Sequence, residues 1–164
     1  MKEKQQARKQ QFVGEVGVVF EQTGLPRMAG RIFGWLLISD PPYQSTDQLA
    51  EVLIASKGSI STMTRLLTQV SLIERLSLPG VRQNYFRLRT DALSNMIKRG
   101  VEDEIKMFRE LAEHGLELLA EEKSLHRKWL EEMRERYAFF ERELPPLLER
   151  WQQGDAKPKK SAVS

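Results

Sequence analysis

Apolar residues recur at helical spacing along most of the chain, and short polar or proline-rich segments separate these runs. Residues 7–22 form the first run and are predicted to be a helix. Gly24 then suits a C-terminal cap, and Pro26 suits the first turn of a second helix that extends to about Ile38. The prolines of "SDPPYQS" end that helix, because proline cannot continue its hydrogen bonds. The apolar positions on the buried sides of the two helices are Phe12, Val16, Val19, Phe20, Ile32, Trp35 and Leu36.

Two short helices follow, with only a tight turn between them. Ser45 is placed to cap the first, which ends near Leu53, and Ser56 is placed to cap the second, which extends to about Val70. The second helix carries one stripe that is expected to be buried, formed by Ile60, Met63, Leu67 and Val70. Two short helices joined in this way are a helix-turn-helix.

The next segment is predicted to be a β-hairpin. Residues 72–78 ("LIERLSL") and 84–89 ("NYFRLR") have strand composition, and Pro79 and Gly80 mark the turn between them. A hairpin that directly follows a helix-turn-helix is a wing. The expected fold class is therefore mainly α, a winged helix-turn-helix with a small β-hairpin wing.

From Thr90, a predicted cap, the chain becomes a long helical region in which Gly115 is expected to weaken or bend the helix. Pro145 and Pro146 are expected to interrupt its second half and leave one last short helix. The apolar side of the first half is Leu93, Ile97, Val101, Ile105, Phe108, Ala112 and Leu119. That of the second half is Trp129, Met133, Tyr137, Phe140 and Leu144. A helix of about thirty residues is roughly 45 Å long, so its apolar side needs another helix, most simply from a second copy of the chain.

Composition narrows the class of protein. The 164 residues include no cysteine, which excludes disulfides, zinc–thiolate sites and cysteine nucleophiles. The longest apolar run, around "WLLI", is short, so we expect neither a signal peptide nor a membrane span, and a cytoplasmic location. The charge is uneven: residues 54–89 contain six basic residues but one acid, Glu74. Basic charge gathered in a short segment is typical of a phosphate-binding surface.

Residues 31–88 resemble the MarR-like winged-helix transcriptional regulators, most closely the GbsR branch. The motifs that carry the resemblance are "GWLLISDPP", "ASKGSIST" at the start of the recognition helix, and "PGVRQNYFRL" in the wing. The resemblance implies a homodimeric regulator that binds double-stranded DNA and is usually a repressor. It places DNA contacts on residues 56–65 and around Arg82. Some relatives sense choline or related osmoprotectants, which implies a small-molecule effector of that kind, although no motif identifies its site.

The pattern along the chain, together with the resemblance, predicts four segments. Residues 1–25 are an N-terminal helix that joins the dimer interface, and residues 26–90 are the winged helix-turn-helix DNA-binding domain. Residues 91–153 are the C-terminal dimerisation helices, and residues 154–164 are a polar tail that is expected to be disordered.

The chemistry of the recognition helix fits DNA. Ser56 and Ser59 suit hydrogen bonds to phosphates or bases, Gly58 leaves room for close approach, and Arg65 suits bidentate binding of guanine. Arginine at the wing tip suits the minor groove or phosphates. The candidate DNA-binding residues are Ser56, Lys57, Gly58, Ser59, Ser61, Thr62, Arg65, Arg82, Gln83 and Asn84. The alternative for these features is an ordinary capped surface helix and a charged turn.

Other functions have less support. Some of the aromatic residues could form a cage for a quaternary ammonium ion, but Trp129, Tyr137 and Phe140 have the helical spacing of core residues. The two histidines, twelve residues apart, do not form a metal motif, and "SKGS" is not a phosphate-binding P-loop. We therefore expect no enzyme, cofactor or metal. A helical protein-interaction adaptor with a degenerate winged helix is the alternative to a regulator.

Overall fold

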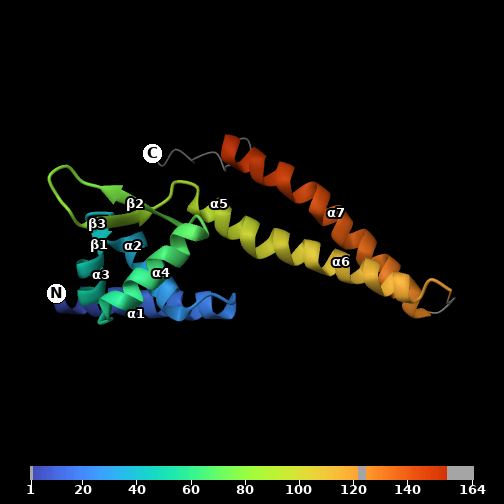
Figure 1. Ribbon diagram of the computed structural model, residues 1–164, viewed down its shortest axis with the longest axis horizontal. Helices are drawn as coiled ribbons and strands as arrows, with labels where there is room; N and C mark the ends of the chain where they lie inside the picture. The colour runs from blue at the N-terminus through green and yellow to red at the C-terminus, as the bar shows by residue number, and fades with distance from the viewer. Residues whose placement is uncertain (1, 122–124, 155–164) are drawn as a thin grey trace, which may run out of the picture. The chain divides into compact units, whose positions relative to one another are not determined.

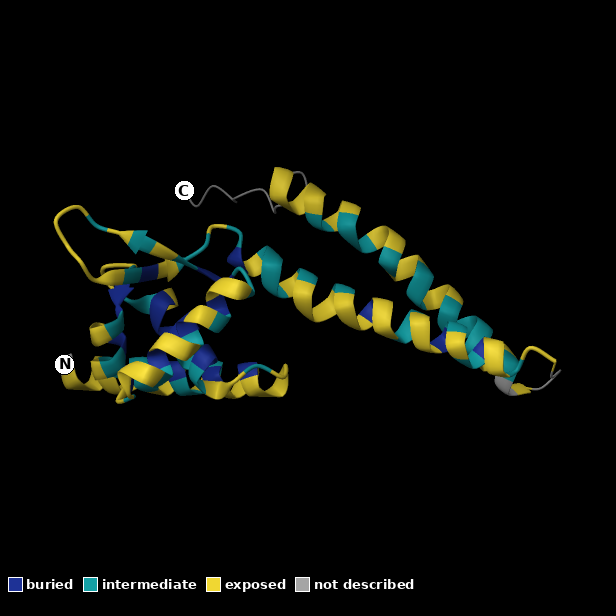
Figure 2. Cartoon of the chain, in the orientation of Figure 1, coloured by how far each residue is buried: buried dark blue, intermediate teal, exposed yellow. Residues whose placement is uncertain are grey.

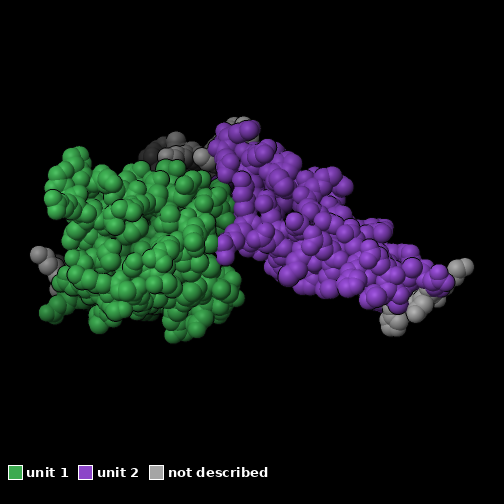
Figure 3. Space-filling view, viewed as in Figure 1, with its two compact units in different colours: residues 1–96 green, residues 97–164 purple. Residues whose placement is uncertain are grey.

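The computed structural model describes residues 2–121 and 125–154, and the chain divides into two compact units, residues 1–96 and 97–164 (Figure 3). The first unit contains helices α1 to α5 and a small sheet, and the second is a helical hairpin (Figure 1). The fold is mainly helical with one antiparallel sheet, which confirms the expected fold class. The predicted tail beyond Gly154 lies outside the described residues.

The first two helices, α1 (Lys2–Gln22) and α2 (Arg27–Ile38), pack closely against each other because glycines face each other at their contact. A Cβ atom on Gly30 would lie 2.8 Å from the Cα of Gly17 and 2.7 Å from the Cβ of Phe20. Phe20 also meets Phe33, with ring centroids 5.3 Å apart. Gly24, at φ +82, turns the chain between the two helices in the left-handed conformation that favours glycine.

The helix-turn-helix consists of α3 (Thr46–Leu53) and α4 (Lys57–Gln69), and both predicted caps are confirmed. The Ser45 hydroxyl accepts from the backbone N–H of Gln48, whose side chain accepts from the Ser45 N–H, so the two form a capping box. Ser56 caps α4 by accepting from the Ser59 N–H at 3.1 Å.

The wing is an antiparallel hairpin of β2 (Ile73–Ser77) and β3 (Asn84–Leu88), as predicted. A two-residue strand that the sequence did not reveal, β1 (Gln44–Ser45), pairs with the other edge of β3 and gives the strand order β1-β3-β2. The sheet is thereby tied to the start of α3, because Ser45 belongs to β1 and also caps that helix.

The core of the first unit lies where α1, α2, α3, α4 and the sheet meet (Figure 2). It includes the predicted Ile32, Trp35 and Leu36 of α2 and the predicted Ile60 and Leu67 of α4. Met63 and Val70 pack against this core from partly buried positions. The buried side of α4 also includes Thr64, whose hydroxyl donates to the Ile60 carbonyl at 2.9 Å, so its burial leaves no unpaired hydroxyl.

An ion pair follows the wing. Arg89 donates two hydrogen bonds to Asp91, at 2.8 and 3.0 Å, and these lower the pKa of the Asp91 carboxyl to about 2. The next helix, α5 (Ala92–Ile97), begins two residues after the predicted cap Thr90. The Asn95 side chain on this helix donates to the Ser71 carbonyl at 2.8 Å, which fixes α5 to the turn that follows α4.

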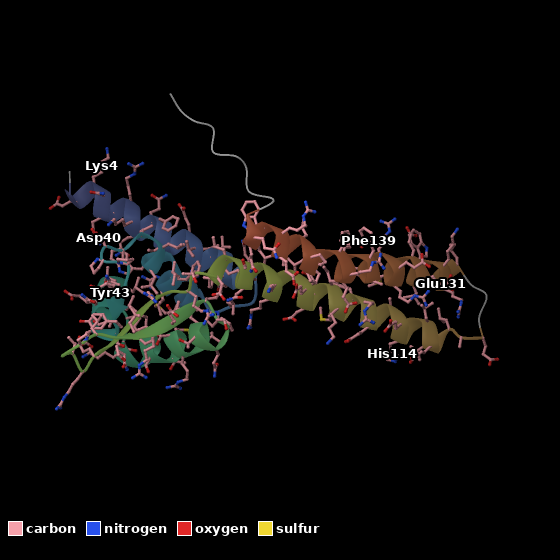
Figure 4. The ribbon with its side chains drawn as sticks, turned by 90° about the horizontal axis from the view of Figure 1, so that it is seen from above. Lys4, Asp40, Tyr43, His114, Glu131 and Phe139 are labelled. Carbon is pink, nitrogen blue, oxygen red and sulfur yellow. The ribbon has the colours of Figure 1, made fainter. Side chains whose placement is uncertain are left out.

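The second unit begins with a π-helical turn, η1 (Lys98–Glu102), followed by α6 (Asp103–Leu118) and α7 (Leu125–Gln153). Helices α6 and α7 lie side by side, with the labelled His114 on α6 and Phe139 on α7 (Figure 4). Their contacts include an aromatic stack, an ion pair and a close approach at a glycine. Phe108 stacks on Tyr137 at 5.2 Å, Arg109 bonds to Glu141, and Leu130 approaches within 2.9 Å of the position that a Cβ on Gly115 would take.

Gly115 lies inside α6, where its missing side chain makes room for Leu130. The prediction for the two prolines is wrong. Pro145 and Pro146 lie inside α7 and do not interrupt it. A proline loses the hydrogen bond to the carbonyl four residues earlier, and its ring crowds that carbonyl. Here those carbonyls belong to Glu141, which is half-buried, and Arg142, which is exposed.

Both helices of the second unit have apolar residues on their outer sides as well as on the shared side. The predicted stripe of α7 splits: Met133, Tyr137 and Leu144 are half-buried, whereas Trp129 and Phe140 are more than half exposed. On α6 the large exposed apolar residues are Met107, Leu111 and Leu118, and on α7 they are Leu125, Trp129, Phe139, Phe140, Leu147 and Trp151. In the described residues no helix is both long and apolar enough to span a membrane.

The close contact of α1 and α2 yields a stability prediction. Gly30→Ala should lower the free energy of unfolding by about 1–3 kcal/mol, because the new methyl group would overpack against Phe20 and Gly17. Gly14→Ala is the matched control, since a Cβ at Gly14 of α1 meets nothing within 4 Å among the described residues. It should be neutral or raise stability by about 0.5–1 kcal/mol. Urea unfolding of the two variants measures both values, and equal stabilities would contradict the prediction.

Candidate nucleic-acid interface

Helix α4 exposes a small, polar face because its apolar stripe is turned into the core. Ser61, Thr62, Arg65, Thr68 and Gln69 are all exposed, on the sides of the helix away from Ile60 and Leu67. Lys57 and Gly58 are exposed in the first turn, where a Cβ on Gly58 would only touch the Ser56 hydroxyl at 4.0 Å. The sequence prediction of a helix with one buried and one polar side therefore agrees with this geometry.

Most hydroxyls of α4 are held by the helix itself. Thr62 donates to the Gly58 carbonyl at 3.0 Å, and Thr68 donates to the Thr64 carbonyl at 2.8 Å. The Ser56 hydroxyl accepts from Ser59, so its own hydrogen stays free to be donated to a ligand. A threonine whose hydrogen is already donated can only accept from a ligand, so Ser56 suits a phosphate better than Thr62 does.

Asp47, in the first turn of α3, connects the start of α4 to the wing. Its carboxylate pairs with the Lys57 ammonium at 2.9 Å and accepts from the Gln83 side-chain amide at 3.1 Å. All three side chains are exposed, so these contacts are individually weak. They nevertheless bring two predicted site residues, Lys57 and Gln83, to the same carboxylate.

The wing tip presents Arg82 as an exposed cation. Gly80, at φ +75, takes the left-handed conformation at the turn that the sequence marked with "PG". Arg82 and Gln83 follow it and are exposed, and Asn84 begins β3. In the described residues neither Arg65 nor Arg82 takes part in an ion pair, whereas Lys57, Arg87 and Arg89 each do.

A groove of about 430 Å³ lies between α4 and the wing. It brings together residues that the sequence assigns to separate elements, the recognition helix and the wing. Ser61 and Arg65 line it from α4, and Asn84 lines it from β3. Arg75 of β2 also lines it and was not among the predicted site residues. Strand alternation, which puts Arg75 on the same face as the buried Ile73, was the available signal. Asp47 was missed because its partners lie ten and 36 residues away.

Among the described residues, no group of three or more histidine, cysteine, aspartate or glutamate side chains is placed to hold a metal ion. The polar side chains that line the groove between α4 and the wing are hydroxyls, amides and the guanidinium groups of two arginines. These can donate hydrogen bonds to an anion and accept them from base edges, which is the chemistry of nucleic-acid recognition.

Comparisons with known proteins assign the chain to a family. A family model described as MmpR5-like MarR family transcriptional regulator matches residues 91–154. The HTH-type transcriptional regulator MmpR5 of Mycobacterium tuberculosis is 40% identical over 146 residues, which cover 87% of this chain and 86% of that protein. A crystal structure of a transcriptional regulator is 39% identical, covers 89% of this chain and 99% of its own, and superposes with a TM-score of 0.69. The MepR–DNA complex of S. aureus is a more distant match, 19% identical over 73% of this chain and 91% of that one, with a TM-score of 0.42.

These relatives are transcriptional regulators and not enzymes, which confirms that expectation from the sequence. They do not confirm the GbsR branch that the motifs suggested, because the family and the relative are both named for MmpR5. With 40% identity to a curated regulator over most of both chains, the protein belongs to the MmpR5-like MarR family of winged-helix transcriptional regulators.

Proposed function

We propose that the protein is a homodimeric, sequence-specific regulator that binds double-stranded DNA through α4 and the wing and represses transcription. The observation that carries the proposal is the exposed face of α4, which is small, polar and free of carboxylates, beside a wing whose Arg82 has no ion pair among the described residues. Such a face fits a major groove about 12 Å wide.

In this arrangement α4 enters the major groove. Ser56 and Ser59 lie at its N-terminus, where backbone N–H groups and the free Ser56 hydrogen favour phosphate. Arg65 lies two turns further along and reads a base, since its guanidinium can bind both acceptors of guanine. Arg82 contacts the minor groove or its phosphates from the wing tip.

The outer sides of α6 and α7 support a homodimer. Met107, Leu111 and Leu118 recur on one side of α6 and are all more than half exposed, opposite the side that meets α7. A monomer rarely leaves such a stripe in water, and a second copy of the chain offers the matching helical surface. A dimer also presents two α4 helices to successive major grooves of a pseudo-palindromic site, about one DNA turn apart.

Repression then follows from steric exclusion of the transcription machinery at that site, in the cytoplasm. Control by a small-molecule effector such as choline, and membership of the GbsR branch, stay predictions from the resemblance. Selection of bound genomic fragments is the test of the sign of regulation: a selected site that overlaps a promoter supports repression, and one upstream of it supports activation. The adaptor alternative predicts no preferred fragment at all.

Arg65→Ala should weaken binding to the selected DNA site by about 1–3 kcal/mol, roughly 5- to 150-fold, because a bidentate base contact is lost. It should change binding to a random duplex much less. Arg82→Ala is the comparison, and it should weaken binding to both duplexes by similar factors if the wing meets phosphates. Fluorescence anisotropy at fixed salt gives the Kd of each variant relative to the wild type on each duplex. An equal loss of affinity for both duplexes with Arg65→Ala would show that Arg65 touches only the backbone.

Asp47→Asn should strengthen binding to a random duplex and steepen its salt dependence by about one unit of log Kd per log salt. The substitution frees Lys57 to meet a phosphate, while the asparagine oxygen can still accept from Gln83. Anisotropy titrations at several salt concentrations measure the slope. Binding that is weaker than in the wild type would contradict this role of the carboxylate.

Leu111→Glu should shift the protein toward monomers at micromolar concentration, because a charge would be buried in the proposed dimer interface. Lys106→Glu is the control, a larger change of charge at an exposed position of α6 away from the apolar stripe. Sedimentation velocity compares the two with the wild type. A wild-type monomer, or a Leu111→Glu variant that stays dimeric, would argue against this surface.

A further inference from the structure

The groove between α4 and the wing gathers two arginines that face the same space. Arg65 comes from α4 and Arg75 from β2, and both side chains line the groove. Gln69 of α4 and Asn84 of β3 add neutral amides that can donate hydrogen bonds. No carboxylate is among the residues that line it.

The strand register explains why the charge in this groove is not neutralised. Arg75 lies opposite Phe86 in the β2–β3 ladder, so its side chain is on the face of the hairpin that turns toward α4. The neighbouring residues of the ladder, Glu74 and Arg87, are directly opposite each other on the other face, where they pair at 2.5 Å. The acid of β2 is thus paired away from the groove, and in the described residues Arg75 has no ion pair.

Two like charges in one groove repel each other, and an anion between them would remove that cost. Both arginines are exposed, so they are hydrated and ready to exchange water for a phosphate oxygen. The groove is lined on one side by exposed residues of α4, the proposed recognition helix. The major groove of DNA is bounded by phosphates, so an element beside a recognition helix meets the backbone.

We propose that this groove seats a phosphate of the DNA backbone, with Arg75 as its principal ligand and Gln69 and Asn84 as neutral donors. The inference rests on the proposed DNA-binding function and adds to it a residue outside the predicted set. Arg75 positions the protein on the duplex and reads no base, whereas Arg65, on the opposite wall, extends to the base edges while its charge supports the same phosphate.

The test compares Arg75→Gln with Arg87→Gln, the same substitution on the opposite face of the same hairpin. Binding of each variant to the selected site and to a random duplex is measured between 50 and 200 mM salt. Arg75→Gln should weaken binding to both duplexes by similar factors. It should also reduce the slope of log Kd against log salt by about 0.9, the value for one phosphate contact. Arg87→Gln should leave the slope unchanged, and circular dichroism checks that both variants fold.

A second measurement locates the phosphate. Single neutral methylphosphonates are placed in turn along the selected site, and at one of them Arg75→Gln should cause no further loss. An Arg75→Gln variant that binds like Arg87→Gln, while the wild type binds DNA, would overturn the phosphate seat and leave the proposed function intact. Tight binding of inorganic phosphate to the free protein, lost in Arg75→Gln, would assign the groove to a free anion and also overturn it. A wild type that binds no duplex would overturn the proposed function itself.

Discussion

The burial of one side of α4 is the interaction on which the surface of the first unit depends. Ile60 and Leu67 are completely buried, and each contributes about 1.5–3 kcal/mol relative to an exposed position. The β-hairpin supplies Ile73 and Phe86 to the same core. Because these apolar residues must face the core, the rotation of α4 about its own axis is fixed. That rotation determines which side chains of α4 remain exposed to a binding partner. The wing is placed beside α4 by the same contacts.

The carboxylates of the first unit are distributed in a way that keeps this surface cationic. Glu74 is paired with Arg87 on the far face of the hairpin, and Asp91 is paired with Arg89 after it. Asp47 of α3 contacts Lys57 of α4 and Gln83 of the wing. On α4 and the wing, the cations that have no ion pair among the described residues are Arg65, Arg75 and Arg82. A net charge of +3 for the whole chain hides this local arrangement.

Local sequence was sufficient to predict the elements that depend on local interactions. Ser45 and Ser56 cap their helices as predicted, since a cap needs only a hydroxyl and the N–H groups that follow it. The two-residue β1 was missed because it has no alternation of its own and exists through its pairing with β3. The contacts of Asp47 and the groove position of Arg75 join separate elements, so only the folded chain brings their partners together. On α7, periodicity predicted one apolar side, but which of its residues are covered depends on where α6 lies.

The hydrogen bonds between the hydroxyls of α4 and the backbone of the same helix have a consequence for the entropy of binding. Thr62, Thr64 and Thr68 each donate to a backbone carbonyl of their own helix, and Ser56 accepts from its first turn. Their rotamers are therefore restricted in the free protein, and the conformational freedom of these side chains is given up during folding and not during association. A partner of α4 meets a helix that is already ordered along its small-residue side, so little of the binding free energy is lost to arranging it.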